Sequence, residues 1–131
     1  MAKQERRHLI VALSFLETKR SFDLGSKKGQ VYVLIEGVKW PQLGHLSMGA
    51  GDRIAFKNHR VLYEGITTND ARLIIDIAVK EHDRLTPDDT FIHHAEQYIV
   101  GTHSSNKRQE VTLENRNIRL KLEIWDQPTK F

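Results

Sequence analysis

The sequence predicts an all-β fold, an antiparallel β-sandwich of about seven to eight strands. Apolar and polar residues alternate along four long segments, β-branched residues dominate these segments, and turn-forming residues separate them. Because successive side chains of a strand point to opposite faces of a sheet, such alternation is typical of a sheet with one buried and one solvated face. Several such segments with turns between them favour a sandwich.

The four long segments each keep their apolar residues on one parity, and they are rich in the residue types that strands prefer. The apolar positions are Leu9, Val11, Leu13 and Phe15; Val31, Val33 and Ile35; Ala71, Leu73, Ile75, Ile77 and Val79; and Ile118, Leu120, Leu122 and Ile124. Shorter strands are expected at residues 53–57, 61–64, 97–100 and 110–113. Glycine, proline and asparagine residues supply the turns between these segments.

One segment also fits a helix. Thr86 is a favoured N-cap residue, Pro87 suits the first helical position, and Asp88 and Asp89 suit the positive end of a helix dipole. A helix over residues 87–98 is therefore the alternative, and it would make the fold α+β.

Length and composition indicate a single domain over residues 1–131, which could be part of a longer protein. The 131 residues include 20 Lys+Arg against 17 Asp+Glu, which gives a formal charge of +3. No apolar run approaches the roughly 20 residues that span a bilayer. The chain has no cysteine and therefore no disulfide and no thiolate metal site. We expect a cytoplasmic, intracellular location, peripheral to a membrane.

An acidic loop follows the third long segment and reads Glu81-x-Asp83-Arg84-Leu85-Thr86-Pro87-Asp88-Asp89. This stretch resembles the Asp-x-Asp-Arg-x-Ser/Thr-x-x-Asp loop of C2 domains. Residues 9–16 resemble the first strand of that family, and Gln30-Val31-Tyr32-Val33 resembles its Tyr-Val strand. The resemblance implies a C2-like β-sandwich in which residues 118–125 form the closing strand.

The first loop departs from the calcium-binding members of the family, in which an Asp-rich loop ends in Ser-Asp-Pro-Tyr. Here Gly29-Gln30-Val31 precedes Tyr32, and Lys27 and Lys28 lie close by. Nearby cations disfavour a divalent cation electrostatically. We therefore expect a calcium-independent member with no metal and no cofactor. If calcium binds, its candidate ligands are Asp23, Glu81, Asp83 and Asp89.

Calcium-independent members commonly dock to phospholipids or proteins, and a basic strand is the family's alternative lipid site. In this chain Arg53 and Lys57 share one face of the strand at 53–57, Arg60 extends the cluster, and Lys27 and Lys28 are expected on an adjoining loop. Several point charges and an arginine fork are suited to holding phosphate oxygens. An ordinary solvated surface is the other interpretation of these cations.

Enzymatic and metal-binding functions are not indicated. His93 and His94 are adjacent and would point to opposite faces of a strand, and the chain has no His-Glu-x-x-His, phosphate-binding loop or nucleophile elbow. We expect a non-catalytic docking module for an anionic phospholipid membrane or a protein partner. The alternatives are a protein-interaction or scaffold domain without lipid binding, and a nucleic-acid-binding β domain that uses Trp40 and Trp125 for stacking.

Overall fold

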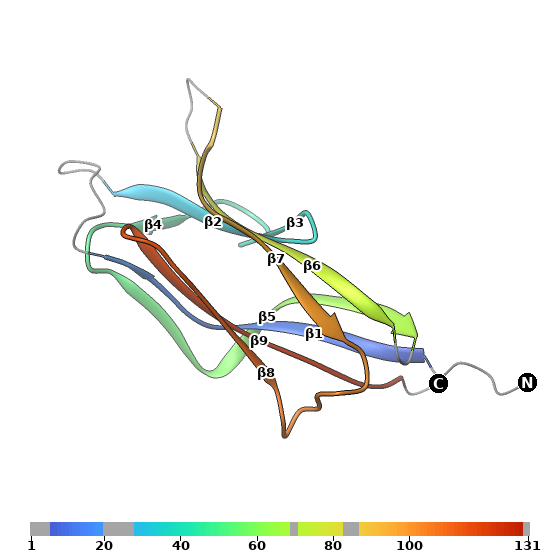
Figure 1. Cartoon of the computed structure of the whole chain (residues 1–131). Coiled ribbons are helices and arrows are strands. Elements are labelled where there is room, and N and C mark those ends of the chain that lie inside the picture. The colour runs from blue at the N-terminus through green and yellow to red at the C-terminus, as the bar shows by residue number, and fades with distance from the viewer. Residues whose placement is uncertain (1–5, 20–27, 69–70, 83–86, 130–131) are drawn as a thin grey trace, which may run out of the picture.

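The computed structural model describes residues 6–19, 28–68, 71–82 and 87–129 (Figure 1). Within these ranges every regular element is a β-strand, so the predicted all-β class is confirmed. The strands of the described residues are β1 (Arg6–Thr18), β2 (Gly29–Ile35), β3 (Val38–Trp40), β4 (Leu46–Met48), β5 (Arg53–Thr68), β6 (Arg72–Glu81), β7 (Asp89–Ile99), β8 (Gln109–Glu114) and β9 (Ile118–Pro128). In this part of the chain no helix is long and apolar enough to cross a membrane.

The strands form two antiparallel sheets that stack as a sandwich. The first sheet has the order β5-β1-β9-β8, and the second has the order β3-β2-β6-β7, with β4 also paired to β2. Figure 1 shows the first sheet below the second, with the long strands of each running across the molecule. Each sheet therefore has an inner face toward the core and an outer face toward solvent.

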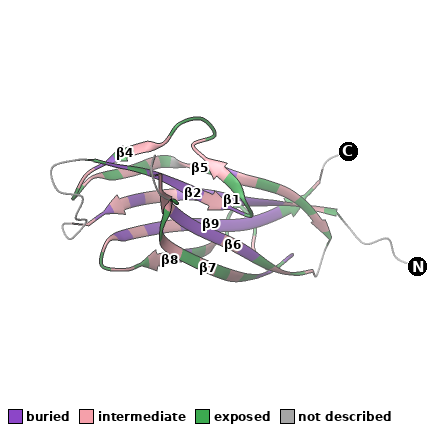
Figure 2. Ribbon diagram, turned by 90° about the horizontal axis from the view of Figure 1, so that it is seen from above, coloured by how far each residue is buried: buried purple, intermediate pink, exposed green. Residues whose placement is uncertain are grey.

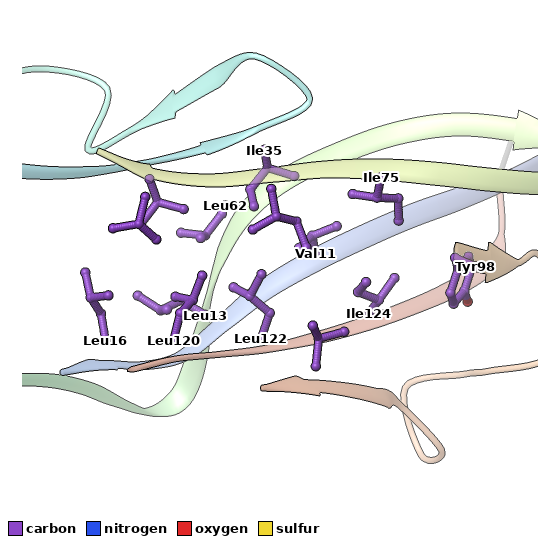
Figure 3. Packing of buried hydrophobic residues seen from close by; sticks show 14 of the residues in the cluster. Val11, Leu13, Leu16, Ile35, Leu62, Ile75, Tyr98, Leu120, Leu122 and Ile124 are labelled. Atoms are coloured by element: carbon purple, nitrogen blue, oxygen red, sulfur yellow. The ribbon is translucent and has the colours of Figure 1, made fainter. Parts of the chain in front are cut away.

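The core lies between the sheets and is formed by the inward parity of the long segments. Figure 3 shows Val11, Leu13, Leu122 and Ile124 from the first sheet packing against Ile35 and other residues of the second. The buried stretches gather on the central strands β1, β9, β2 and β6 (Figure 2). The alternation read from the sequence is confirmed for these strands.

Phe15 is an exception to the predicted inward set. The register of β1 shifts between Leu13 and Phe15, so Leu16 takes the next core position and Phe15 turns to the outer face. A β-bulge inserts one residue and reverses the parity of the strand beyond it. The sequence pattern alone does not reveal such an insertion.

The alternative prediction of a helix over residues 87–98 is wrong. Residues Asp89–Ile99 form β7, which pairs with β6 from the partners Arg72 and Ile99 to Glu81 and Asp89. The helix-start residues favour a helix only at the beginning of the segment. The ladder to β6 runs along the whole of β7, and it places Tyr98 in the core. Tertiary pairing therefore decides the conformation.

The strand count also differs in detail from the prediction. The short strands expected at 53–57 and 61–64 are one strand, β5, which is interrupted by a bulge where His59 has a φ of 54°. The three-residue strands β3 and β4 were not predicted. They are too short to show a periodic pattern.

Candidate anion-binding face

The outer face of the first sheet carries a group of cations near the end of the sandwich where β1 ends. We call this surface the basic face and define it by Lys19, Arg53, Lys57, Arg119 and Lys121. The register places Glu17 opposite both Arg53 of β5 and Arg119 of β9. Phe15 likewise lies opposite Ala55 and Lys121. Directly opposite residues project from the same side of a sheet, so three strands contribute to one surface.

Ion pairs bind most of these cations into a network. The Glu17 carboxylate lies 4.0 Å from Arg53 Nε and 3.9 Å from Arg119 Nη1. Glu114 accepts a 2.7 Å hydrogen bond from Arg119 Nε and a second one from Lys19 Nζ. These two donors, Arg119 first, lower the pKa of Glu114 to about 2. The carboxylate therefore stays ionised in mild acid and continues to hold the two cations.

The basic face carries more positive than negative charge. Its five cations face three carboxylates, Glu17, Glu110 and Glu114, of which Glu110 lies 3.6 Å from Lys121 Nζ. Within the described part of the chain, Lys57 is exposed and has no ion-pair partner. The surplus attracts anions, and it is concentrated on the β5 side.

An aromatic ring supports one of the cations. The Arg53 guanidinium carbon lies 4.5 Å from the centroid of the Phe15 ring. This cation–π contact holds the guanidinium over the ring. The outward turn of Phe15 at the bulge makes the contact possible, because an inward Phe15 would lie on the far side of the sheet.

The residues predicted for an anion site do not all lie on one surface. Arg53 and Lys57 lie on the basic face. Lys28 is exposed next to the turn at residues 49–52, since a Cβ on Gly49 would lie 3.5 Å from Lys28 Cγ. That turn leads into Arg53 and is tied to β1 by a 2.9 Å bond from Thr18 N to Asp52 O. Lys28 therefore adjoins the basic face, whereas Lys27 lies outside the described residues.

Arg60 does not share this face. It is exposed, but the register pairs it with Leu13, a core residue, instead of an outer-face residue. Lys57 and Arg60 are three positions apart, so they have opposite parity along β5 and project to opposite sides of the sheet. Arg60 thus projects from the inner side of an edge strand.

Sequence reasoning did not assign Lys19, Arg119 and Lys121 to the site. The alternation of residues 117–123 puts Arg119 and Lys121 on the polar parity, and this signal was readable. What it could not show is the strand order β5-β1-β9, which brings them beside Arg53 and Lys57.

Of the residues considered for calcium, Glu81 ends β6 and Asp89 begins β7. Glu81 and Asp89 are partners at the last position of the ladder, and Asp23 and Asp83 lie outside the described residues. In the described ranges no group of three or more His, Cys, Asp or Glu residues is arranged to hold a metal ion.

Asp88 is engaged by protein groups. It accepts a hydrogen bond from the Tyr32 phenol, and its second oxygen lies 3.3 Å from His82 Nδ1. Burial, followed by the hydrogen bond to Asp88, raises the pKa of Tyr32 to about 12. The His82 ring stacks on His45, with centroids 4.5 Å apart and planes 5° from parallel. Burial, with Lys39 and His82 nearby, lowers the pKa of His45.

The remaining histidines and tryptophans are also in contact with other residues. His93 lies 2.6 Å from Asp76, and His94 lies 2.6 Å from Glu96. The Trp125 ring is 6% exposed, packs with Ile10 and Ala12, and is covered by the Arg108 guanidinium at 3.9 Å. Trp40 packs edge-on against Phe56. As they lie, these two rings do not form the exposed platforms on which bases stack.

No protein-family model matches the sequence, and no curated protein matches it at a significant level. Among solved structures, 30 chains match. Human GIVD cytosolic phospholipase A2, in complex with a methyl γ-linolenyl fluorophosphonate inhibitor and terbium chloride, aligns with a TM-score of 0.65 at 13% identity, covering 96% of this chain and 18% of that chain. The same human enzyme in a second structure aligns with a TM-score of 0.63 at 13% identity, covering 98% and 17%.

The likeness is one of fold. This chain spans less than a fifth of the length of the phospholipase chains that it matches. A Drosophila structure described as C2-DSL-EGF1 aligns with a TM-score of 0.42 at 9% identity, covering 92% of this chain and 67% of that one, which is too low to establish a shared fold.

Proposed function

We propose that this chain is a non-catalytic, calcium-independent docking module of C2-like type that binds an anionic phospholipid surface through the basic face. The observation that carries the proposal is the surplus of cations on one outer sheet face, with Lys57 outside the ion-pair network and Lys28 adjoining. A broad sheet face suits a membrane surface better than a small ligand, which needs a concave site.

The electrostatics predict weak and salt-dependent binding. Each cation near an anionic membrane contributes about 1 kcal/mol, and the attraction falls off within a Debye length of roughly 8–10 Å. Three carboxylates on the same face oppose this attraction, so the surplus cations, Lys57 and Arg53 foremost, supply most of it. A peripheral, cytoplasmic location follows from this mode of binding and stays a prediction.

Two further observations support the proposal. The sequence resembles C2 domains in its acidic loop, and the fold resembles part of a phospholipase A2, an enzyme that by its name acts on phospholipid. Asp88, the neighbour of the candidate ligand Asp89, is engaged by Tyr32 and His82, which supports independence from calcium because this carboxylate does not add to an ion site. Lys28, close to the first loop, adds repulsion for a divalent cation.

Vesicle sedimentation tests the proposal. The chain should sediment with phosphatidylcholine vesicles that contain phosphatidylserine, in the presence of a calcium chelator, and not with phosphatidylcholine alone. The double variant Arg53→Gln, Lys57→Gln should lose about tenfold or more in affinity, because two cations of about 1 kcal/mol each are removed.

The matched control is Arg60→Gln with Arg72→Gln, which removes two exposed cations that lie off the basic face. This variant keeps the same net charge as the first and should bind nearly as well as the parent chain. Equal losses in the two variants would show a nonspecific charge effect and would contradict the proposal. The proposal would also be contradicted if the parent chain sediments with neither kind of vesicle.

A further inference from the structure

The second sheet has a gap along one of its strands. β2 ends at Ile35, which pairs with Ile77, so β2 covers β6 only from Ile77 to Glu81. Over Arg72–Ile75, β6 pairs with β7 alone. Figure 1 shows β6 and β7 running on past the end of β2, toward the end of the sandwich where the chain termini lie. We call the exposed side of Arg72–Ile75 the open edge.

The direction of the backbone groups at the open edge follows from Asp76, the neighbouring residue of β6, which is bonded to Glu36. Asp76 faces the β2 side, because its carbonyl accepts a 2.9 Å bond from Glu36 N and its N–H donates a 2.5 Å bond to Glu36 Oε1. In an antiparallel ladder, both polar groups of alternate residues point to the same edge. The N–H and C=O groups of Ile74 and Arg72 therefore also point to this side, where none of the described strands pairs with them.

Apolar side chains flank these backbone groups. A groove of about 150 Å³ lies between β5 and β6, and its walls include Leu9, Tyr63, Ile66, Leu73 and Ile75. On the outer face a second hollow of about 210 Å³ is lined in part by Ile74 and Ile99. Both spaces are smaller than the roughly 300–1,000 Å³ of small-molecule sites, and they suit single side chains.

Three isoleucines around the open edge are unusually exposed. Ile66 is 60% exposed, Ile74 is 65% exposed and Ile99 is 46% exposed, and together they are half of the exposed large hydrophobic residues in the described ranges. Edge strands are usually protected by lysine, proline or a covering segment. Here the centre of the open edge is an isoleucine, and Arg72 is the one cation on it.

We propose that the open edge is a docking site for an extended peptide segment of a partner protein, which adds to β6 as a strand in line with β2. Unpaired donors and acceptors at strand spacing are matched by another extended backbone, and alternate side chains supply specificity. One parity of the segment enters the groove between β5 and β6, and the other packs on Ile74. The partner segment is therefore aliphatic at its centre and about four residues long at the contact.

This site is separate from the basic face. The groove includes Tyr63 and Ile66, toward the end of β5, whereas Arg53 is the first residue of that strand. The proposal goes beyond membrane docking and does not depend on it. A partner strand at the open edge leaves the basic face uncovered.

The test uses the full chain labelled with ¹⁵N and a synthetic peptide, Lys-Val-Thr-Val-Thr-Val-Lys, acetylated and amidated at its ends. In the free chain the Arg72 and Ile74 amides should exchange with solvent faster than those of Leu73 and Ile75, which point to β7. Addition of the peptide should slow exchange at Arg72 and Ile74. An analogue N-methylated at two successive valines, whose N–H groups face β6, should bind about tenfold more weakly, because two hydrogen bonds of roughly 0.5–1.5 kcal/mol are lost.

The variant Ile74→Lys tests the apolar contact and should abolish peptide binding. Its matched control is Val38→Lys on β3, which is 48% exposed and lies away from the open edge. Both variants should keep the thermal midpoint of the parent chain within a few degrees, since both side chains are exposed at the surface. Equal binding of the N-methylated analogue, undiminished binding by Ile74→Lys, or no binding up to millimolar peptide would overturn the proposal. Vesicle binding by Ile74→Lys should be unchanged, which keeps this result distinct from the membrane test.

Discussion

The phenol of Tyr32 donates a hydrogen bond to the carboxylate of Asp88 and so ties β2 to the segment that precedes β7. Tyr32 is 8% exposed, and the carboxylate is the group that satisfies its hydroxyl. The same carboxylate lies next to His82, which stacks on His45. A loop that in sequence resembles a cation site is thus joined to the sheet by protein contacts.

Tyr32→Phe should lower the free energy of unfolding by about 1–3 kcal/mol, because it leaves Asp88 without this donor. Urea unfolding at neutral pH measures the change. Tyr63→Phe is the control, since no hydrogen bond of the Tyr63 hydroxyl is found in the described residues. A similar loss in both variants would mean that the Tyr32–Asp88 bond does not stabilise the fold.

The pH dependence of Tyr32 follows from its raised pKa. The pKa rises from 10.0 to about 12 on folding. Because the folded value is the higher one, the stabilisation is fully present below pH 10 and is lost as pH rises through 12. Ultraviolet titration of tyrosinate in the parent chain should show a tyrosine that ionises near pH 12 and is absent from Tyr32→Phe. Tyr98 ionises later still in both chains, because burial and its hydrogen bond to Asp126 raise its pKa further.

Calcium should not change the stability of the chain. A ligand that binds only the native state raises the unfolding midpoint, so the thermal midpoint should be the same with calcium and with a chelator. Asp83→Asn and Asp89→Asn should likewise leave vesicle binding unchanged. A calcium-dependent rise in the midpoint that either variant removes would show that the acidic loop binds the ion.

Glu17→Gln should strengthen binding to anionic vesicles by about fivefold. Glu17 lies opposite both Arg53 and Arg119 and offsets their charge, and one unit of charge near the membrane is worth about 1 kcal/mol. Glu64→Gln is the control, because Glu64 pairs with His8 away from the basic face. Weaker or equal binding by Glu17→Gln would place the membrane contact elsewhere.

Asp126→Asn should be the most destabilising of these changes. Asp126 is fully buried, pairs with Arg7, and accepts hydrogen bonds from the Tyr98 hydroxyl and the Gly101 amide. Removing one partner of a buried ion pair costs about 3–5 kcal/mol. Asp76→Asn, which removes a half-exposed partner of His93, should cost about 1 kcal/mol or less. Denaturant unfolding of both variants decides whether burial accounts for the difference.

The three residues of β5 that were predicted for the anion site lie on two different faces of the sheet. Arg53 and Lys57 were correctly placed on one face, because strict alternation holds over residues 53–57. Arg60 was expected to extend them, yet it pairs with the core residue Leu13 and projects from the other side, because it has the opposite parity to Lys57 along β5. The same alternation that puts Arg53 and Lys57 on one face therefore excludes Arg60 from it.

By itself the sequence determined the all-β class, the sandwich and the inward residues of the long strands, because alternation is a local property with a period of two. Strand order was decided only by the tertiary structure, since pairing depends on which segments bury each other's apolar faces. That order brings Arg119 and Lys121 beside Arg53 and joins Tyr32 to Asp88. It also decides where β2 stops short of β6, and so leaves the backbone of Ile74 and Arg72 open on one side.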